Sequence, residues 1–188
     1  MNSKMTLNET VREALGIALI QIMDSKSFSD ITIQEIATVA GVSRSSFYRN
    51  FSTKEDLLHS YITSIYRTFF SSSEFVRCLT VPTQVRNFLE PRFRFIKEHS
   101  HIYRALHRNN LLYPFFQQAE DDLLLLLCGQ DESLSTYHRA MISGSCAGVI
   151  QCWIERDFQE DPEAMAMCFS DLCQYPLLIK ELMQKQTG

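Results

Sequence analysis

The chain has 188 residues, of which 45% are hydrophobic, so it can bury a core and is not a disordered tail. Its net charge of −4 indicates no general affinity for nucleic acid, and its first 60 residues carry six Lys or Arg against seven Asp or Glu. If the chain binds nucleic acid, the affinity must therefore come from the placement of a few charges, and such modest, salt-sensitive binding per subunit would favour a dimer.

Composition also predicts the fold class and the cellular setting. Only six glycines and five prolines interrupt long stretches of helical periodicity, which indicates an all-α protein. No apolar run approaches the roughly 20 residues that cross a bilayer, and no signal peptide is recognisable. The six cysteines form no CxxC pair, so we expect reduced thiols in a cytoplasmic protein without a membrane partner.

The first predicted helix begins after Thr6, which forms a capping box with Glu9. Apolar residues then recur at helical spacing as far as Ile22, which gives this helix one buried face. A polar loop over residues 26–30 follows, in which the Phe28 side chain is expected to pack against the hydrophobic core.

Two short helices around a tight turn are predicted over residues 32–51. Thr32 is expected to cap the first of them, and Glu35 completes a capping box. Gly41 supplies the left-handed conformation that ends this helix, and Ser43 caps the next one. This arrangement is a helix-turn-helix.

The second helix of this pair has a polar outer face. Phe47 and Phe51 lie four residues apart and must face inward, so Ser45 and Arg49 point away from the core. Lys54 stands in the first turn of the following helix, where a cation is unfavourable unless a phosphate approaches. Hydroxyl, amide and guanidinium groups on such a face suit base edges and phosphates. The alternative is an ordinary helical hairpin with a solvated polar face.

This segment resembles the DNA-binding domain of the TetR family of bacterial transcriptional regulators, over roughly residues 6–60. The resemblance is carried by Thr32, Ile33, Ile36, Ala37, Ala40, Gly41, Val42, Ser43, Phe47, Tyr48, Phe51, Lys54 and Leu57.

The resemblance implies a role for each polar residue of the segment. The residues in positions that reach base edges are Gln34, Ser43, Arg44, Ser45 and Ser46. The residues in positions that contact phosphates are Thr32, Tyr48, Asn50 and Lys54. Arg49 also points outward and suits either role. Ser45 stands where the family commonly has glycine, and Asn50 where it commonly has histidine or tyrosine. These two differences leave the operator sequence undetermined, but they do not change the predicted fold.

The remaining chain predicts further helices and a second domain. Thr53 is expected to cap a helix that runs to about Phe70. In the family that the sequence resembles, this helix links the DNA-binding domain to the regulatory domain. We expect a helix-turn-helix DNA-binding domain over residues 1–54 and a helical regulatory and dimerisation domain over residues 55–188. Later helices are expected over residues 82–98, from Ser100, through the five leucines 123–127, over residues 133–158, and from Asp161 with Pro162 at its first position.

The last two helices are long and apolar, and paired with a second copy they would form a four-helix bundle. This is the family's usual homodimer, and symmetric dimers suit palindromic operators. The alternative is that the two helices only close the core of the monomer.

A stretch over residues 144–148 imitates a nucleophile elbow with Cys146 at its centre. An elbow needs a strand before it, whereas this stretch lies within a helical pattern, where small residues let two helices approach. The histidines show no helical pairing with a carboxylate partner, and no glycine-rich phosphate loop occurs. We therefore expect no metal, no cofactor and no enzymatic activity.

Aromatic residues are abundant after residue 68, and the resemblance implies that some of them line a small-molecule pocket. The candidate ligand-binding residues are Phe88, Arg92, Tyr103, His107, Phe116, Gln117, Tyr137, Met141 and Gln151. The sequence thus predicts an all-α regulator that binds DNA, in that family most often a repressor, released from a palindromic operator by an unknown small-molecule effector. An activator or adaptor controlled by a protein partner, and a helical enzyme that uses Cys146, are the alternatives.

Overall fold

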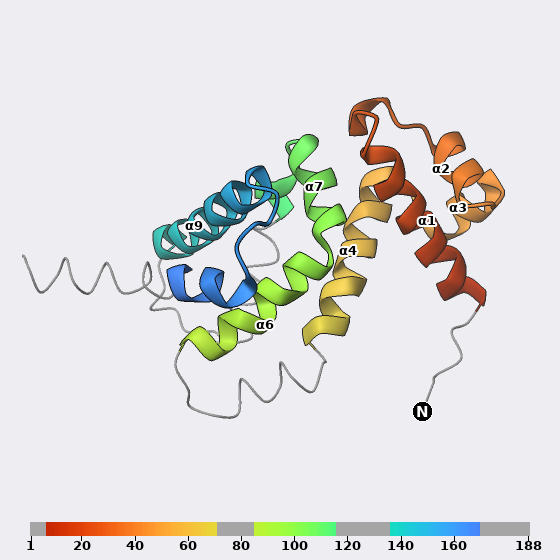
Figure 1. The fold of residues 1–188 in the computed structure, drawn as a ribbon. Helices are drawn as coiled ribbons and strands as arrows, with labels where there is room; N and C mark the ends of the chain where they lie inside the picture. Colours follow the sequence, from red (N-terminus) through yellow and green to blue (C-terminus); the bar gives the residue numbers. More distant parts are fainter. Residues whose placement is uncertain (1–6, 71–84, 116–135, 170–188) are drawn as a thin grey trace, which may run out of the picture. The chain divides into compact units, whose positions relative to one another are not determined.

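The structure is a computed structural model that describes residues 7–70, 85–115 and 136–169 (Figure 1). Over these ranges every regular element is a helix, which confirms the predicted all-α fold. The elements are α1 (Leu7–Met23), the 3₁₀ turn η1 (Phe28–Asp30), α2 (Ile33–Val39), α3 (Arg44–Asn50), α4 (Lys54–Phe70), α6 (Val85–Glu98), α7 (Ser100–Arg108) and α9 (Thr136–Glu155). Residues 112–115 and 162–169 are also helical.

The chain divides into two compact units. The first comprises Met1–Ser71 and His101–Leu112, and the second comprises Ser72–Ser100 and Tyr113–Gly188. Residues of α4 and α7 thus belong to the same unit as the helix-turn-helix, and the expected domain division after residue 54 stays a prediction. Only His99 separates α6 from α7 along the chain.

In the first unit, α1 packs against α2, α3 and α4 (Figure 1). Its core is closely packed, since Leu15, Ile36 and Phe47 are each 0% exposed. Gly16 faces the ring of Tyr61, and a Cβ built on Gly16 would lie 2.2 Å from that ring. The absence of a side chain at this position therefore lets α1 and α4 approach closely.

In the second unit, aromatic rings hold α6, α9 and the helix over residues 162–169 together. The Phe93 ring lies 5.7 Å from that of Trp153 and 6.1 Å from that of Phe169, measured between centroids. Asp161 caps the helix over residues 162–169, as predicted, because its Oδ1 accepts a hydrogen bond of 2.8 Å from Ala164 N.

The end of α9 differs from the prediction. The sequence predicts a helix that continues to about Phe158, whereas α9 ends at Glu155. Asp157 and Phe158 adopt positive φ angles of 56° and 55°, and Phe158 N donates back to Trp153 O at 2.9 Å. The Phe158 ring packs 5.0 Å from that of Trp153, and this burial offsets the cost of the left-handed backbone.

Several predicted features lie outside the described residues: the Thr6 cap, the leucine run 123–127 and the part of the last helix beyond residue 169. Among the helices that the structure describes, none is both long enough and apolar enough to span a bilayer.

Candidate nucleic-acid interface

The start of α2 has the predicted capping box. Thr32 Oγ1 accepts from Glu35 N at 3.2 Å, and Glu35 Oε2 accepts from Thr32 N at 2.9 Å. Lys26 Nζ donates to the other carboxylate oxygen of Glu35 at 2.6 Å. The hydrogen bond from Lys26, followed by those from Thr32, lowers the pKa of Glu35 from 4.5 to about 2. The carboxylate therefore fixes both the first turn of α2 and the loop before it.

The turn between α2 and α3 is also built as predicted. Gly41 has a φ of 68°, in the left-handed region that favours glycine, and Val42 N donates to Ala37 O at 2.9 Å. Ser43 Oγ then accepts from Ser46 N at 3.1 Å and caps α3. These two devices set the angle between the helices and complete the helix-turn-helix.

The faces of α3 separate as the helical period requires. Phe47 is 0% and Phe51 4% exposed, whereas the Tyr48 side chain is 49% exposed. The remaining exposed residues on and beside α3 are Ser43, Arg44, Ser45 and Arg49. The surface predicted to meet DNA is therefore open to solvent.

Contacts along α3 order these exposed side chains. The Arg44 guanidinium lies 5.4 Å from the centroid of the Tyr48 ring, and its Nη2 donates to the Tyr48 hydroxyl at 3.2 Å. Arg49 Nη2 donates to Ser46 Oγ at 2.9 Å. Both cations are exposed and neither has an acidic partner in α3, so the exposed surface of this helix presents positive charge and hydroxyl groups together.

The other expected DNA contacts are engaged within the protein. Asn50 is half-buried and its Nδ2 donates to Ser46 O at 2.8 Å. Lys54 Nζ donates to the carbonyl oxygens of Phe28, Ser29 and Ile31. Thr32 is exposed, and the exposed Gln34 donates to Thr38 Oγ1 at 3.2 Å. The DNA contacts of these residues stay predictions.

Arg12, which no sequence pattern marks as functional, contacts the end of α3. Its Nη1 donates to Asn50 O at 3.2 Å and its Nη2 to Ser60 Oγ at 2.7 Å. The guanidinium also stacks over the Phe51 ring, 4.4 Å from the centroid. A cation at this point caps the carbonyl end of α3, which suits the helix dipole. The only signal in the sequence was its place beside the apolar stripe of α1.

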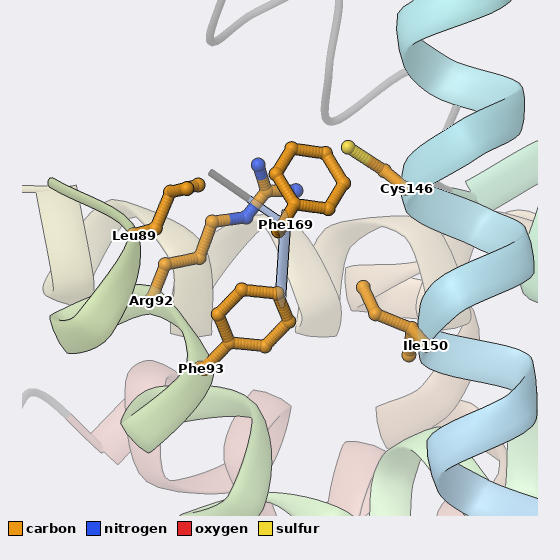
Figure 2. A pocket seen from close by; sticks show the side chains of 6 residues that line it. All are labelled: Leu89, Arg92, Phe93, Cys146, Ile150 and Phe169. Atoms are coloured by element: carbon orange, nitrogen blue, oxygen red, sulfur yellow. The ribbon is translucent and has the colours of Figure 1, made fainter. Parts of the chain in front are cut away.

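The candidate ligand-binding residues are only partly placed. Arg92 is 6% exposed and lines a small cavity of about 10 Å³ with Leu89, Phe93, Cys146, Ile150 and Phe169 (Figure 2). Figure 2 shows Leu89, Arg92 and Phe93 reaching from α6 and Cys146 and Ile150 from α9.

The other candidates lie elsewhere or outside the described residues. Tyr103 belongs to the first unit, where its hydroxyl lies 2.7 Å from that of Tyr66. His107 also belongs to the first unit, and the exposed Gln151 donates to Glu155 Oε1 at 2.9 Å. The side chains of Phe88, Tyr137 and Met141 and the whole of Phe116 and Gln117 are outside the described residues.

Cys146 is buried within α9, and the helical pattern predicted around it is confirmed. In the three described ranges, no three His, Cys, Asp or Glu side chains come together in a way that could hold a metal ion.

Comparisons with known proteins agree with this geometry. The sequence model of the bacterial regulatory proteins of the tetR family matches residues 18–61, and that of a transcriptional regulator C-terminal region matches residues 83–175. The uncharacterized HTH-type transcriptional regulator YxbF of Bacillus subtilis (strain 168) is 24% identical over 168 residues, which are 84% of this chain and 43% of that protein. The chain thus spans less than half the length of this curated relative.

Two solved structures are similar in fold. The fatty acid degradation regulator FadR from Bacillus halodurans has a TM-score of 0.59 and 18% identity, with 90% of this chain and 96% of that chain covered. The TetR family repressor AlkX from Dietzia sp. strain DQ12-45-1b, implicated in biodegradation of n-alkanes, has a TM-score of 0.53 and 21% identity, with 95% and 98% covered. At these identities the likeness shows the fold.

The shifted pKa of Glu35 makes part of the stability depend on pH. Because the folded-state pKa of about 2 lies below the ordinary 4.5, the ionised carboxylate stabilises the fold above pH 4.5 and loses this effect as the pH falls toward 2. Glu35→Gln should lower the free energy of unfolding at pH 7, and its difference from wild type should shrink at pH 3. Urea denaturation at the two pH values measures this. Glu55→Gln, at an exposed position in the first turn of α4, is the control, and an equal deficit of Glu35→Gln at both pH values would contradict the prediction.

Proposed function

Since the chain belongs to the tetR family of bacterial regulatory proteins, we propose that it is a sequence-specific DNA-binding transcriptional regulator, and that it acts as a repressor in the cytoplasm. The observation that carries the proposal is the solvent-exposed surface of α3, where Arg49 points away from the buried Phe47 and Arg44 and Tyr48 are exposed on the flank of the helix. No residue from 36 to 54 is acidic, so nothing on this helix repels a phosphate backbone.

The dimensions and chemistry of α3 suit the major groove. A helix of seven residues is about 10 Å long, and the groove is about 12 Å wide. The Arg44 guanidinium offers paired donors to a guanine edge. Because it already stacks on Tyr48, the side chain loses less conformational entropy when it binds. The Ser45 and Ser46 hydroxyls can donate or accept, so they suit several bases.

A homodimer through α9 and the helix after it supports this function, because one short reading helix contacts few base pairs. The exposed face of α9 carries small residues, including Ser145, Gly148 and Cys152. A Cβ built on Gly148 meets nothing within 4 Å, so the fold of the described chain does not itself require glycine there. Met167, on the next helix, is 47% exposed. A second copy of the chain would cover these residues and bring two copies of α3 to one duplex.

We further propose that an effector in the second unit releases the protein from DNA. The support is the cavity beside Arg92, which is apolar apart from that guanidinium. Its volume of about 10 Å³ holds roughly one water molecule, so an effector must displace side chains to enter. This small volume favours the alternative that a protein partner controls the same fold, and the two are separated by experiment.

The operator is found by selecting duplexes from random-sequence DNA with the full chain. Arg44→Ala should then weaken binding of the recovered duplex by about 1–3 kcal/mol and blur one position of the motif, because a paired contact to one base is lost. Arg94→Ala, which removes an exposed arginine of α6, serves as the control. The DNA-binding proposal fails if the wild type enriches no motif, or if Arg44→Ala recovers the wild-type motif with wild-type affinity.

The dimer is tested by placing a charge on the open face of α9. Gly148→Arg should leave the helical content unchanged, since nothing lies within 4 Å of a Cβ there, but should shift the sedimentation coefficient from dimer to monomer. Glu98→Arg introduces the same side chain at the exposed end of α6 and should sediment as the wild type does. A dimeric Gly148→Arg protein would show that the interface lies elsewhere.

The effector is sought by screening small molecules for release of the selected duplex from the wild-type protein. Compounds that act are then titrated against Arg92→Met and against the control Arg94→Met. Loss of the buried guanidinium should raise the half-maximal concentration about tenfold without weakening DNA binding. If no compound releases the duplex, or if Arg92→Met responds as Arg94→Met does, control by a protein partner is the better explanation.

A further inference from the structure

The loop that joins α1 to α2, residues 24–31, is held on one side by the end of α7. Asn109 Oδ1 accepts from Phe28 N at 2.6 Å, and Asn109 Nδ2 donates to Met23 O at 3.3 Å and to Ala105 O at 2.8 Å. The neighbouring Arg108 donates to Asp24 O at 2.5 Å. One carboxamide thus satisfies polar backbone groups of both the loop and its own helix.

The same loop is held on its other side by Lys54, at the start of α4. Its ammonium donates to Phe28 O at 2.6 Å, to Ser29 O at 2.8 Å and to Ile31 O at 3.0 Å, which uses all three N–H groups. It also lies 4.9 Å from the centroid of the Phe28 ring. The backbone of Phe28 is therefore hydrogen-bonded on both sides, through its N–H to Asn109 and through its C=O to Lys54.

These contacts explain why a lysine is favourable at the first position of α4. A cation there opposes the helix dipole, but three carbonyl dipoles from the end of η1 face this ammonium and offset the repulsion. No phosphate is needed to account for the residue.

The loop leads directly into the helix-turn-helix. Ile31 is 3% exposed, and Thr32, the next residue, is the N-cap of α2. Lys26, within the loop, pairs with Glu35 in the first turn of α2 at 2.6 Å. The position of the loop therefore sets where α2 begins and, through the Gly41 turn, how α3 is presented.

We infer that Asn109 and Lys54 are positioning residues for DNA recognition, which fix the 24–31 loop from opposite sides and orient α3 without touching DNA. The inference rests on the proposed function, and it assigns to the end of α7 an influence on operator affinity. Loss of the Asn109 side chain leaves the Phe28 N–H and the Met23 carbonyl without their partners, and such groups are costly to leave unsatisfied.

The test compares Asn109→Ala with Asn110→Gly on the duplex selected by the wild type. Asn110→Gly removes the adjacent carboxamide, which is exposed, at a φ of 57° that glycine adopts readily. Asn109→Ala should bind the duplex about tenfold more weakly than Asn110→Gly, with the same base preferences. Asn109→Asp keeps an acceptor for Phe28 N and should recover part of the loss. Equal affinities of Asn109→Ala and Asn110→Gly would overturn the inference.

Salt dependence separates the positioning role of Lys54 from a phosphate contact. Lys54→Met should weaken binding while the slope of log K against log salt concentration keeps its wild-type value. A lysine that neutralises a phosphate in the complex would instead lower the magnitude of the slope by about 0.9 on removal. A slope change of that size would overturn the assignment of Lys54.

Hydrogen exchange gives a readout that does not depend on DNA. Backbone amides of residues 24–41 should exchange faster in Asn109→Ala and in Lys54→Met than in the wild type or Asn110→Gly, while protection in α9 stays the same. Unchanged exchange over residues 24–41 in a folded Asn109→Ala protein would refute the inference even if no duplex were recovered. Failure of the wild type to select any duplex contradicts the proposed function instead, so the two failures are distinguishable.

Discussion

Burial of Phe47 and Phe51 against α1 is the constraint on which the rest of the first unit depends. The two rings lie 6.0 Å apart and fix the rotation of α3 about its axis, because a helix cannot bury one side without exposing the opposite one. Every polar group on the outer face of α3 owes its exposure to these two rings. The function proposed for the protein therefore begins with a hydrophobic contact and not with a charge.

Several basic residues of the first unit stabilise the fold. Arg12 and Lys54 donate to backbone carbonyls, and Lys26 pairs with Glu35. In the second unit Lys97 donates to Glu160 O at 3.0 Å in the same manner. A cation placed on the free carbonyls at the end of a helix or turn satisfies groups that no backbone N–H reaches. The exposed positive charge of the helix-turn-helix is thus concentrated at Arg44 and Arg49 on α3, where we propose that DNA binds.

The second unit uses its small residues and aromatic rings differently. Phe93, Trp153 and Phe169 fill the space between its helices, while the glycine at position 148 lies on an exposed face of α9. One face of α9 therefore packs in the core of the second unit, and the other face is exposed, where we propose that a second copy binds. The buried Arg92 is the exception within the core, since a guanidinium in apolar surroundings is retained only where polar groups accept its hydrogen bonds.

Local chemistry was sufficient to predict the Thr32–Glu35 capping box, the Gly41 turn, the Ser43 and Asp161 caps and the inward side of α3, because each depends on residues at most five positions apart. The sequence by itself therefore determined the helix-turn-helix and the family. Tertiary structure alone decided the distant partners of Arg12, Lys54 and Asn109, which lie 23 to 86 residues away along the chain. The sequence does not show whether a long, flexible Lys or Arg side chain is solvated or bound to the protein. Only the packed structure shows which carbonyl oxygens it reaches. The end of α9 at Glu155 was likewise settled by the Trp153 and Phe158 rings, since no glycine marks the stop and burial of two rings outweighed the backbone preference.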